Sequence, residues 1–398
     1  MAILSKLKSF INKILENNNR VAFIWFGLVF LTLLGAVSNH SYNNFIIFKQ
    51  SFFHLHQKLN LYNVYPAEYW DHYYYSPSFA ILVAPFAIIP SILGPFAWGL
   101  LDAGVLYYAI RKLPIGSYYQ NVILLLSVNE MMNTSANLQS NGMIAASIIL
   151  SFTYLLKQKE HKATLSLLLG FFIKLYGIVG LAFFFFSKQK RMYVVYFVLC
   201  TIILVLLPLL ITSPEFLMQS YQDWIKSLSL KSNFDLTVDM YKNMVDISLQ
   251  GMVKRIFNLP KLNKLYFIIP GLVLLVSQYI QIKYFNHLVY QLYILCSVML
   301  FVIVFNTGSE SPTYIIGVVP ICLWYVLQRK TILVNTLFII AIFFSSFSYS
   351  DLFTPWLRMN IMAPYALKVV GCFLIWVVIL LQIHTKQFLT IDQNKLIV

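Results

Sequence analysis

Three ionisable side chains stand inside long apolar stretches of this sequence, where a charge is costly and commonly marks a functional site. They are Asp102, Glu130 and Lys174. A carboxylate beside a substrate hydroxyl can remove its proton, and an ammonium group can balance the charge of a phosphate. A buried acid or base can equally pair with other groups inside a helical bundle, so both interpretations stay open for Asp102 and Lys174.

Further polar residues gather next to apolar segments. Asp71 lies among Trp70, His72 and three tyrosines, and Glu310 lies within Ser309-Glu310-Ser311-Pro312. An amide cluster around one junction is either a hydrogen-bonding link between helices or a ligand site. Its members are Asn129, Asn133, Asn137, Gln139 and Asn141. We expect Asp71 and Glu310 to face the same side and to meet in one polar cavity.

The composition identifies the environment of these groups. Hydrophobic residues make up 59% of the 398 positions and charged residues 11%, whereas a soluble domain carries roughly 25% charge. The apolar runs are long and continuous, which favours membrane-spanning helices over a barrel. The net charge of +15 fits basic residues that flank spans by the positive-inside rule, and nucleic acid is not an expected partner.

These patterns predict an all-α polytopic transmembrane bundle with about twelve spans. A basic amphipathic helix over 1–20 precedes a single transmembrane domain over 21–383, and 384–398 form a cytoplasmic tail. The spans are expected at 21–38, 77–92, 95–111, 118–133, 141–156, 163–187, 191–212, 265–284, 287–305, 312–327, 331–349 and 363–383. Outer loops follow at 39–76 and 213–264, and the first should hold a helix flat on the membrane surface.

The expected topology has one conflict. With both ends inside, the basic residues 188–191 and 329–330 lie inside, but 111–112 and 157–162 fall outside, against the rule. The span count can therefore be wrong by one pair. The long segment 163–187 is expected to tilt or break near Lys174 and Gly177. No nucleotide-binding loop is present, which excludes an ATP-driven pump.

Four motifs in this order resemble glycosyltransferase family 87, the polyprenyl-phosphate-sugar-dependent enzymes of the C-type membrane glycosyltransferases. The resemblance spans roughly 40–330. Leu61-Tyr62 with 73–80 and 84–86 is similar to the family's "lY…Y-x-P-lfa…aP", and 138–142 is similar to "GQ-x-N". Residues 173–176 are similar to "K-x-yP", and 246–249 with Arg255 are similar to "NQSL…R".

The sequence also departs from the family pattern. Family members carry a carboxylate in the first outer loop, where this chain has Asn43 and Asn44. An amide can bind a hydroxyl but cannot take its proton. Leu138 stands where the family has Gly, and Asp246 stands where it has Asn.

The resemblance implies an inverting hexosyltransferase with a C-type fold in a bacterial plasma membrane. It would move a hexose, with mannose as the family-level expectation, from a polyprenyl-phosphate donor to a lipid or glycan acceptor at the outer face. Asp71 is the first candidate base and Glu310 the second. Arg255, and behind it Lys174, would balance the phosphate, while Asn44, Gln139 and Asn141 would hold sugar hydroxyls.

No cofactor is expected and no ligand cluster indicates a metal. Two alternatives stay open: a transporter or flippase of lipid-linked sugars, and a catalytically inactive relative. The missing early acid fits the transporter better, but we find no symmetry between two halves of the kind that transporters often show.

Overall fold

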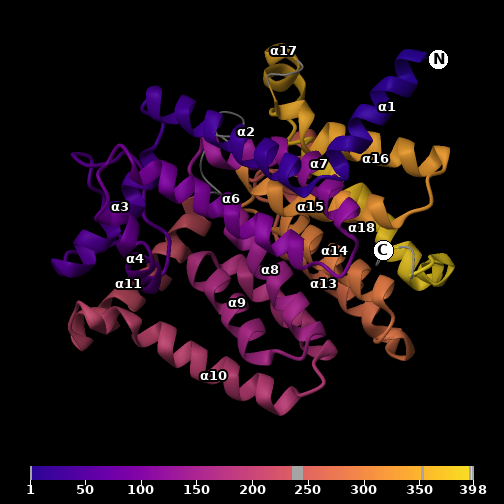
Figure 1. Ribbon diagram of the computed structural model, residues 1–398. Helices are drawn as coiled ribbons and strands as arrows, with labels where there is room; N and C mark the ends of the chain where they lie inside the picture. The colour runs from indigo at the N-terminus through magenta and orange to yellow at the C-terminus, as the bar shows by residue number, and fades with distance from the viewer. Residues whose placement is uncertain (1, 235–244, 351–353, 394–395, 397–398) are drawn as a thin grey trace. The chain divides into compact units, whose positions relative to one another are not determined.

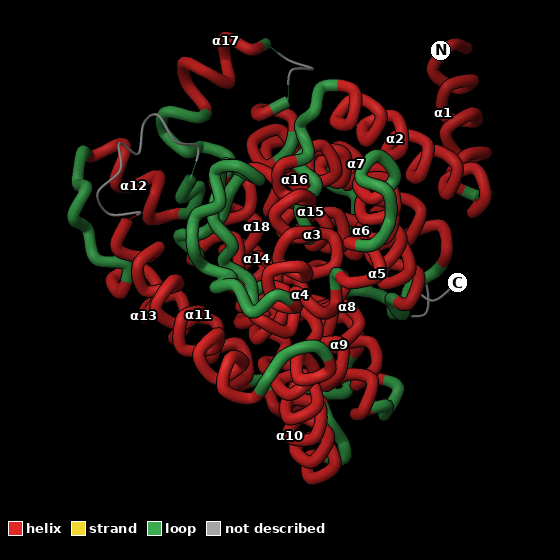
Figure 2. Tube along the Cα trace, turned by 90° about the vertical axis from the view of Figure 1, so that its left-hand side faces the viewer, coloured by secondary structure: helices red, strands yellow, loops and turns green. Residues whose placement is uncertain are grey.

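The computed structural model describes residues 2–234, 245–350, 354–393 and 396. These residues form helices joined by loops and turns, with no strand among them (Figures 1 and 2). The predicted all-helical fold is therefore confirmed. Within these described residues, four helices are long and apolar enough to cross a membrane, and shorter apolar helices accompany them. The four are Asn18–Ser38, Lys190–Leu210, Leu288–Phe305 and Ile332–Tyr349.

The helices follow one another along the whole chain. The α-helices are α1 (Ala2–Leu15), α2 (Asn18–Ser38), α3 (Asn43–His56), α4 (Pro77–Leu82), α5 (Ala84–Ala87), α6 (Gly94–Lys112), α7 (Ser117–Ala136), α8 (Asn141–Leu156), α9 (Glu160–Ile173), α10 (Lys190–Leu206), α11 (Pro214–Phe234), α12 (Leu249–Phe257), α13 (Leu265–Ser277), α14 (Leu288–Phe305), α15 (Ile315–Leu327), α16 (Ile332–Ser345), α17 (Pro355–Leu357) and α18 (Val369–His384). The 3₁₀ helices include η1 (Leu175–Phe186) and η5 (Ser311–Tyr314).

The chain divides into two compact units. Unit 1 comprises Met1–Val29, Leu106–Asn133 and Met240–Val398, and unit 2 comprises Phe30–Val105 and Thr134–Asp239. In unit 1, α14 is buried along almost its whole length and packs against α15 and α18. In unit 2, α8 is buried in the same way between α9 and η1. An all-apolar helix of this kind belongs in the interior of a bundle.

The segment 163–187 is broken, as the sequence predicts. α9 ends at Ile173, Lys174 is extended (φ −141°, ψ 136°), and η1 follows. A Cβ on Gly177 would overlap the backbone of Gly170, and a Cβ on Gly180 would lie 3.1 Å from Leu167. Gly177 of η1 therefore lies beside Gly170 of α9, and Gly180 lies beside Leu167, so the two helices run in opposite directions. α9 and η1 form an antiparallel hairpin, and Lys174 lies at its tip.

The segment 77–92, predicted as one span, is not a single continuous helix. Two short helices, α4 and α5, occupy this region instead. Ser76 caps the first by accepting a hydrogen bond from the Phe79 N–H (3.1 Å). Pro85 stands in the second, and proline cannot supply the N–H that would continue a regular helix.

The two predicted outer loops contain more packed structure than expected. The first holds α3 over the predicted apolar stripe, but Phe45, Phe48 and Leu55 are buried. Phe48 packs edge-on against the Phe79 ring, with a 5.2 Å centroid distance. These three residues of the stripe therefore face the protein, and the flat orientation of the helix on the membrane stays a prediction. The second loop holds α11 and α12.

Candidate functional site

The lysine at the tip of the α9–η1 hairpin is held by two amide side chains. Lys174 Nζ donates to Asn141 Oδ1 (2.9 Å) and to Gln139 Oε1 (3.2 Å). Asn141 Nδ2 donates to the same Gln139 oxygen (2.7 Å). Asn141 is the first residue of α8, and Gln139 precedes it in the connecting loop. The "GQ-x-N" and "K-x-yP" elements therefore meet in space, which brings three predicted substrate-binding residues together.

Asp102 lies next to this cluster and binds the first turn of α8. It is fully buried, and its carboxylate accepts hydrogen bonds from the N–H groups of Gly142 (3.2 Å) and Met143 (2.6 Å). A Cβ on Gly142 would lie 2.7 Å from this carboxylate, so glycine is needed for the close approach. Asp102 also interacts electrostatically with Lys174. Of the two interpretations left open, the structure shows Asp102 with partners inside the bundle.

Aromatic rings flank the lysine. Lys174 Nζ lies 6.0 Å from the ring centroid of Tyr75 and 5.9 Å from that of Tyr176. Tyr75 belongs to the aromatic-rich stretch that the sequence singles out. A partly buried cation among aromatic rings and amide groups can bind an anionic oxygen of a ligand.

Asn43 and Asn44, which stand where the family has an acid, both form side-chain hydrogen bonds. Asn44 Nδ2 donates to the Asn137 carbonyl (2.8 Å), which links α3 to the loop that carries Gln139. Asn43 Oδ1 accepts from the Trp70 N–H (3.2 Å). The Asn43 Nδ2 group is buried and has no hydrogen-bond partner within the described part of the chain.

Asp71 lines a cavity of about 720 Å³ between the loop over residues 60–74 and α11. Its Oδ1 accepts from the His72 N–H (2.7 Å). α11 supplies Asp223, Lys226 and Lys231 to the same cavity. None of these three residues was predicted from the sequence to belong to the site. The signal available was a segment that alternates apolar and charged residues at helical spacing, but its position over Asp71 depends on tertiary packing.

Aromatic and amide groups fix the shape of this cavity. Lys231 Nζ lies 4.3 Å from the centroid of the Tyr74 ring, which also lines it. Asn60 Nδ2 donates to Asp223 Oδ2 (2.9 Å) and so ties the loop to α11. Tyrosine rings beside carboxylate and amide groups form a surface that suits a sugar, which offers both apolar faces and hydroxyls.

Arg255 lies in unit 1 and is buried. It donates to the backbone carbonyls of Ala363 (3.2 Å) and Val245. Asp246, the first residue of the same motif, has a left-handed backbone (φ 55°), and its carboxylate lies 3.9 Å from Lys254 Nζ. These contacts fold the motif into a compact turn. The phosphate-binding role of Arg255 stays a prediction.

The turn that contains Glu310 packs on this motif. The Ile247 N–H donates to the Ser309 carbonyl (2.7 Å), and the Tyr314 hydroxyl donates to the Ile247 carbonyl (2.7 Å). The Glu310 N–H donates to Thr313 Oγ1 (3.2 Å) and begins η5. Within unit 1, the structure therefore brings the Asp246–Leu249 element against the Glu310 turn. Asp71 belongs to unit 2, and its predicted meeting with Glu310 and Arg255 stays a prediction.

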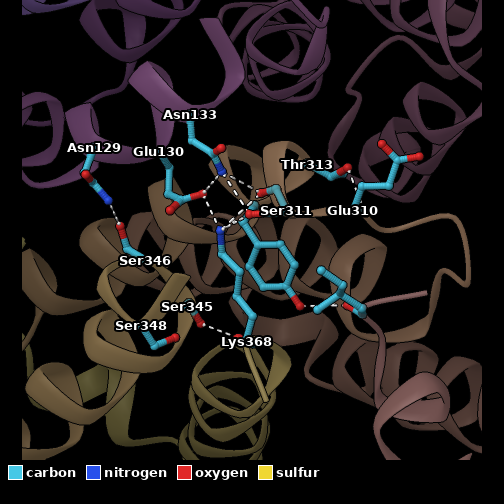
Figure 3. A network of polar contacts seen from close by, with 12 residues as sticks. Asn129, Glu130, Asn133, Glu310, Ser311, Thr313, Ser345, Ser346, Ser348 and Lys368 are labelled. Carbon is cyan, nitrogen blue, oxygen red and sulfur yellow. Dashed lines mark hydrogen bonds and ion pairs between the residues drawn. The ribbon is translucent and has the colours of Figure 1, made fainter. Parts of the chain in front are cut away.

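A fully buried ion pair lies next to this turn, and only its acid, Glu130, was predicted from the sequence as a candidate functional group. Lys368 Nζ lies 2.9 Å from Glu130 Oε2, and it also donates to Ser311 Oγ (2.9 Å). Asn133 Nδ2 donates to Glu130 Oε2 (3.3 Å) and to the Ser311 carbonyl (3.1 Å). Figure 3 shows the network, with the Glu310 carboxylate directed away from Lys368. A lysine inside the predicted span 363–383 was the signal that could have identified it.

Two observations bear on metals and thiols. Among the residues that the structure describes, no group of three or more His, Cys, Asp or Glu side chains could hold a metal ion. The four cysteines are free thiols, and Cys296, Cys322 and Cys372 are buried.

Comparison with known proteins identifies the family. No curated protein matches the chain. The sequence model of glycosyltransferase family 87 matches residues 73–306, more than half of the chain. This range includes Tyr75, the Gln139–Asn141–Lys174 cluster and the turn at Asp246. The chain therefore belongs to glycosyltransferase family 87 and is a membrane glycosyltransferase by family.

Proposed function

We propose that this protein transfers a hexose from a polyprenyl-phosphate donor to a lipid or glycan acceptor at the outer membrane face, with inversion. The observation that carries the proposal is the Gln139–Asn141–Lys174 cluster. Its ammonium is fixed by two amide oxygens at a partly buried hairpin tip. Such a cation can stabilise the phosphate as it departs, because the charge that develops there meets an oriented donor.

We assign Lys174, ahead of Arg255, to the donor phosphate. Arg255 is only 3% exposed and donates to two backbone carbonyls. Lys174 is more exposed than Arg255 but still partly buried, and its amide partners can also bind sugar hydroxyls. Asn44 reaches the same loop through the Asn137 carbonyl.

Asp71 remains the first candidate base and Glu310 the second. In the proposed step, the acceptor oxygen attacks the anomeric carbon while its proton passes to the carboxylate. The bond between that carbon and the phosphate oxygen breaks, and polyprenyl phosphate leaves with the electron pair. Asp71 suits the base because it lines a cavity with tyrosine and amide groups that can receive an acceptor sugar. A positioned base typically contributes about 10²–10⁴-fold to the rate.

The hairpin also suggests a topology that removes the conflict with the positive-inside rule. If 77–92 does not cross the membrane and 163–187 crosses twice, the total of about twelve crossings is unchanged. Residues 111–112 and 157–162 then move to the inside, where basic residues are favoured. Lys174 moves to the outside, together with the loop that carries Gln139.

Cysteine labelling tests this topology. In a Cys200→Ser background, a membrane-impermeant maleimide applied to intact cells should label Gln57→Cys but not Lys112→Cys. Labelling of both residues in intact cells would refute the proposed arrangement. Permeabilised cells provide the control, since both cysteines should then react.

Sugar transfer in proteoliposomes tests the chemistry. With a polyprenyl-phosphate hexose as donor, Lys174→Gln should lower turnover by about 10²–10³-fold, the cost of losing one oriented donor. Lys174→Arg should retain part of the activity, and Lys188→Gln, an exposed lysine at an inner turn, should be unaffected. Wild-type turnover in Lys174→Gln would refute the assignment. Asp71→Asn and Glu310→Gln test the base, and unchanged turnover in both would exclude them.

The amides at 43 and 44 keep a transporter or flippase as the second candidate. An inactive relative is the third. Donor consumption separates them, because only the transferase releases polyprenyl phosphate and forms a new glycoside. A protein that moves the intact donor between leaflets without consuming it would be the transporter.

A further inference from the structure

The first two helices meet at an elbow on the basic N-terminal part of the chain (Figure 1). α1 ends at Leu15 and α2 begins at Asn18. Between residues 2 and 20 the sequence has four basic residues and one acidic residue, Glu16. By topology this end lies at the cytoplasmic membrane surface.

The elbow is held in a fixed geometry by a buried amide. Asn121 is fully buried, and its Nδ2 donates to the Leu15 carbonyl (2.7 Å) and to Asn18 Oδ1 (2.9 Å). The Arg111 guanidinium donates to Asn18 Oδ1 (3.2 Å) and to Asn121 Oδ1 (2.5 Å). Both the end of α1 and the start of α2 are therefore tied to α6 and α7. A concave surface between them is preformed and needs no ordering of the chain on binding.

That surface is a cavity of about 630 Å³ lined by both basic and apolar side chains. Phe10, Lys13 and Ile14 face it from α1, and Arg20, Phe23 and Ile24 face it from α2. The spacing within each set places its members on one side of a helix. Phe10 is 62% exposed and Phe23 is 81% exposed. Two cations at the bend thus adjoin apolar groups that water would solvate poorly.

We propose that this elbow binds one anionic phospholipid of the inner leaflet. The headgroup phosphate lies between Lys13 and Arg20, and an acyl chain runs along Phe10, Phe23 and Ile24. Charge and apolarity together select this occupant. A free anion would leave the aromatic rings uncovered, and a lipid without net charge would leave both cations unmatched. The inference is independent of the sugar-transfer mechanism.

Native mass spectrometry of the purified full-length protein tests the site. Phosphatidylglycerol and phosphatidylcholine are titrated separately, and retention of each lipid is measured. We expect phosphatidylglycerol to bind more tightly. The double variant Lys13→Gln/Arg20→Gln should weaken that binding by about thirtyfold, from the attraction that two basic residues add beside an anionic lipid.

A matched variant separates a defined site from diffuse charge. Lys6→Gln/Lys8→Gln removes the same charge from the same helix but lies outside the cavity, so its affinity should change by less than about threefold. Equal weakening in both double variants, or no weakening in either, would overturn the proposal. Phe23→Gln keeps every charge and should still weaken phosphatidylglycerol binding. That variant provides the test if the first double variant does not fold.

A competition arm separates lipid from phosphate. Inorganic phosphate in large excess should leave phosphatidylglycerol bound, since the acyl-chain contacts contribute to affinity. Complete displacement by inorganic phosphate would show an anion site only and would overturn the lipid assignment.

Discussion

Replacement of Lys368 by methionine tests whether the buried network of unit 1 holds the Glu310 turn in place. Lys368 Nζ contacts Glu130 Oε2 (2.9 Å), Ser311 Oγ (2.9 Å) and the Ser311 carbonyl (3.2 Å). Methionine fills a similar volume but removes all three contacts. The Glu130 carboxylate, 1% exposed, would keep only its neutral partners. Loss of one member of a buried pair costs about 3–5 kcal/mol, because the remaining charge stays uncompensated.

The double variant Glu130→Met/Lys368→Met separates the pair from general packing. With both charges gone, Asn133 can still donate to Ser311, and no ion stays unpaired in the interior. Replacement of a buried pair by apolar residues is often neutral or stabilising. We therefore expect each single variant to lose about 3–5 kcal/mol and the double variant to lose less than either.

Reversible unfolding in mixed detergent micelles measures these free energies. Lys261→Met, at an exposed lysine, is the control and should lie within about 0.5 kcal/mol of wild type. Sugar transfer gives a second readout: because Ser311 adjoins Glu310, Lys368→Met should also lower turnover in protein that remains folded. If Lys368→Met has the same free energy of unfolding as Lys261→Met, the proposed pairing of Lys368 with Glu130 in the folded protein is refuted.

Three other changes test separate parts of unit 2. Burial lowers the pKa of His54 below 6.5, against the raising effect of Glu68. Near this pH the folded protein therefore binds fewer protons than the unfolded chain, and its free energy of unfolding should fall as the pH drops from 6.5 through the lowered pKa. His54→Gln should flatten this pH dependence in unfolding titrations. Gly177→Ala should lose about 1–3 kcal/mol by overpacking the hairpin, whereas Gly27→Ala, with open space around it, should not. Leu138→Gly relieves the strain of a left-handed backbone (φ 47°), about 1–2 kcal/mol, but deletes a fully buried side chain that contributes about 3–5 kcal/mol. We therefore expect a net loss in the free energy of unfolding. A gain would show that the backbone strain is the larger effect.

The parts of the site that local chemistry dictates were predictable from the sequence. Lys174 is a charge in an apolar segment, and Gly177 follows it closely, so a break was expected where the hairpin turns. The motif order placed Gln139 and Asn141 in the same site, and the structure joins both to Lys174. The break at Lys174 followed from spacing and the cost of a charge in lipid, whereas the roles of Gln139 and Asn141 followed from the resemblance to the family.

The remaining features depend on tertiary packing. α11 carries mixed polar and apolar residues, and nothing within that segment indicates that Lys226 and Lys231 lie over Asp71. The apolar stripe of α3 has the spacing of a surface helix, but buried neighbours such as Phe79 cover it. Lys368 gave the same signal as Lys174 and was missed because it stands near the predicted start of a span, where a lysine commonly reaches the interface.

The departures from the family pattern are of two kinds: two concern the backbone conformation, and two change the chemistry available. Leu138 and Asp246 both adopt left-handed backbones, with φ of 47° and 55°. Glycine and asparagine, the residues of the family pattern, are those that enter this region most readily. At both positions the pattern therefore reflects a backbone requirement, which this chain still meets at some cost in strain.

The amides at 43 and 44 differ, because they change the chemistry available and leave the backbone helical. Asn44 uses its N–H to bind the Asn137 carbonyl, so an aspartate there would place a carboxylate against a carbonyl. Asn43 accepts through Oδ1, and its Nδ2 has no partner within the described part of the chain, so an aspartate at 43 keeps the existing bond to Trp70. Of the two positions, only 43 can take back a carboxylate without breaking an observed contact. If Asn43→Asp raises sugar transfer and Asn44→Asp abolishes it, the chain retains the family's catalytic geometry and lacks only the acid.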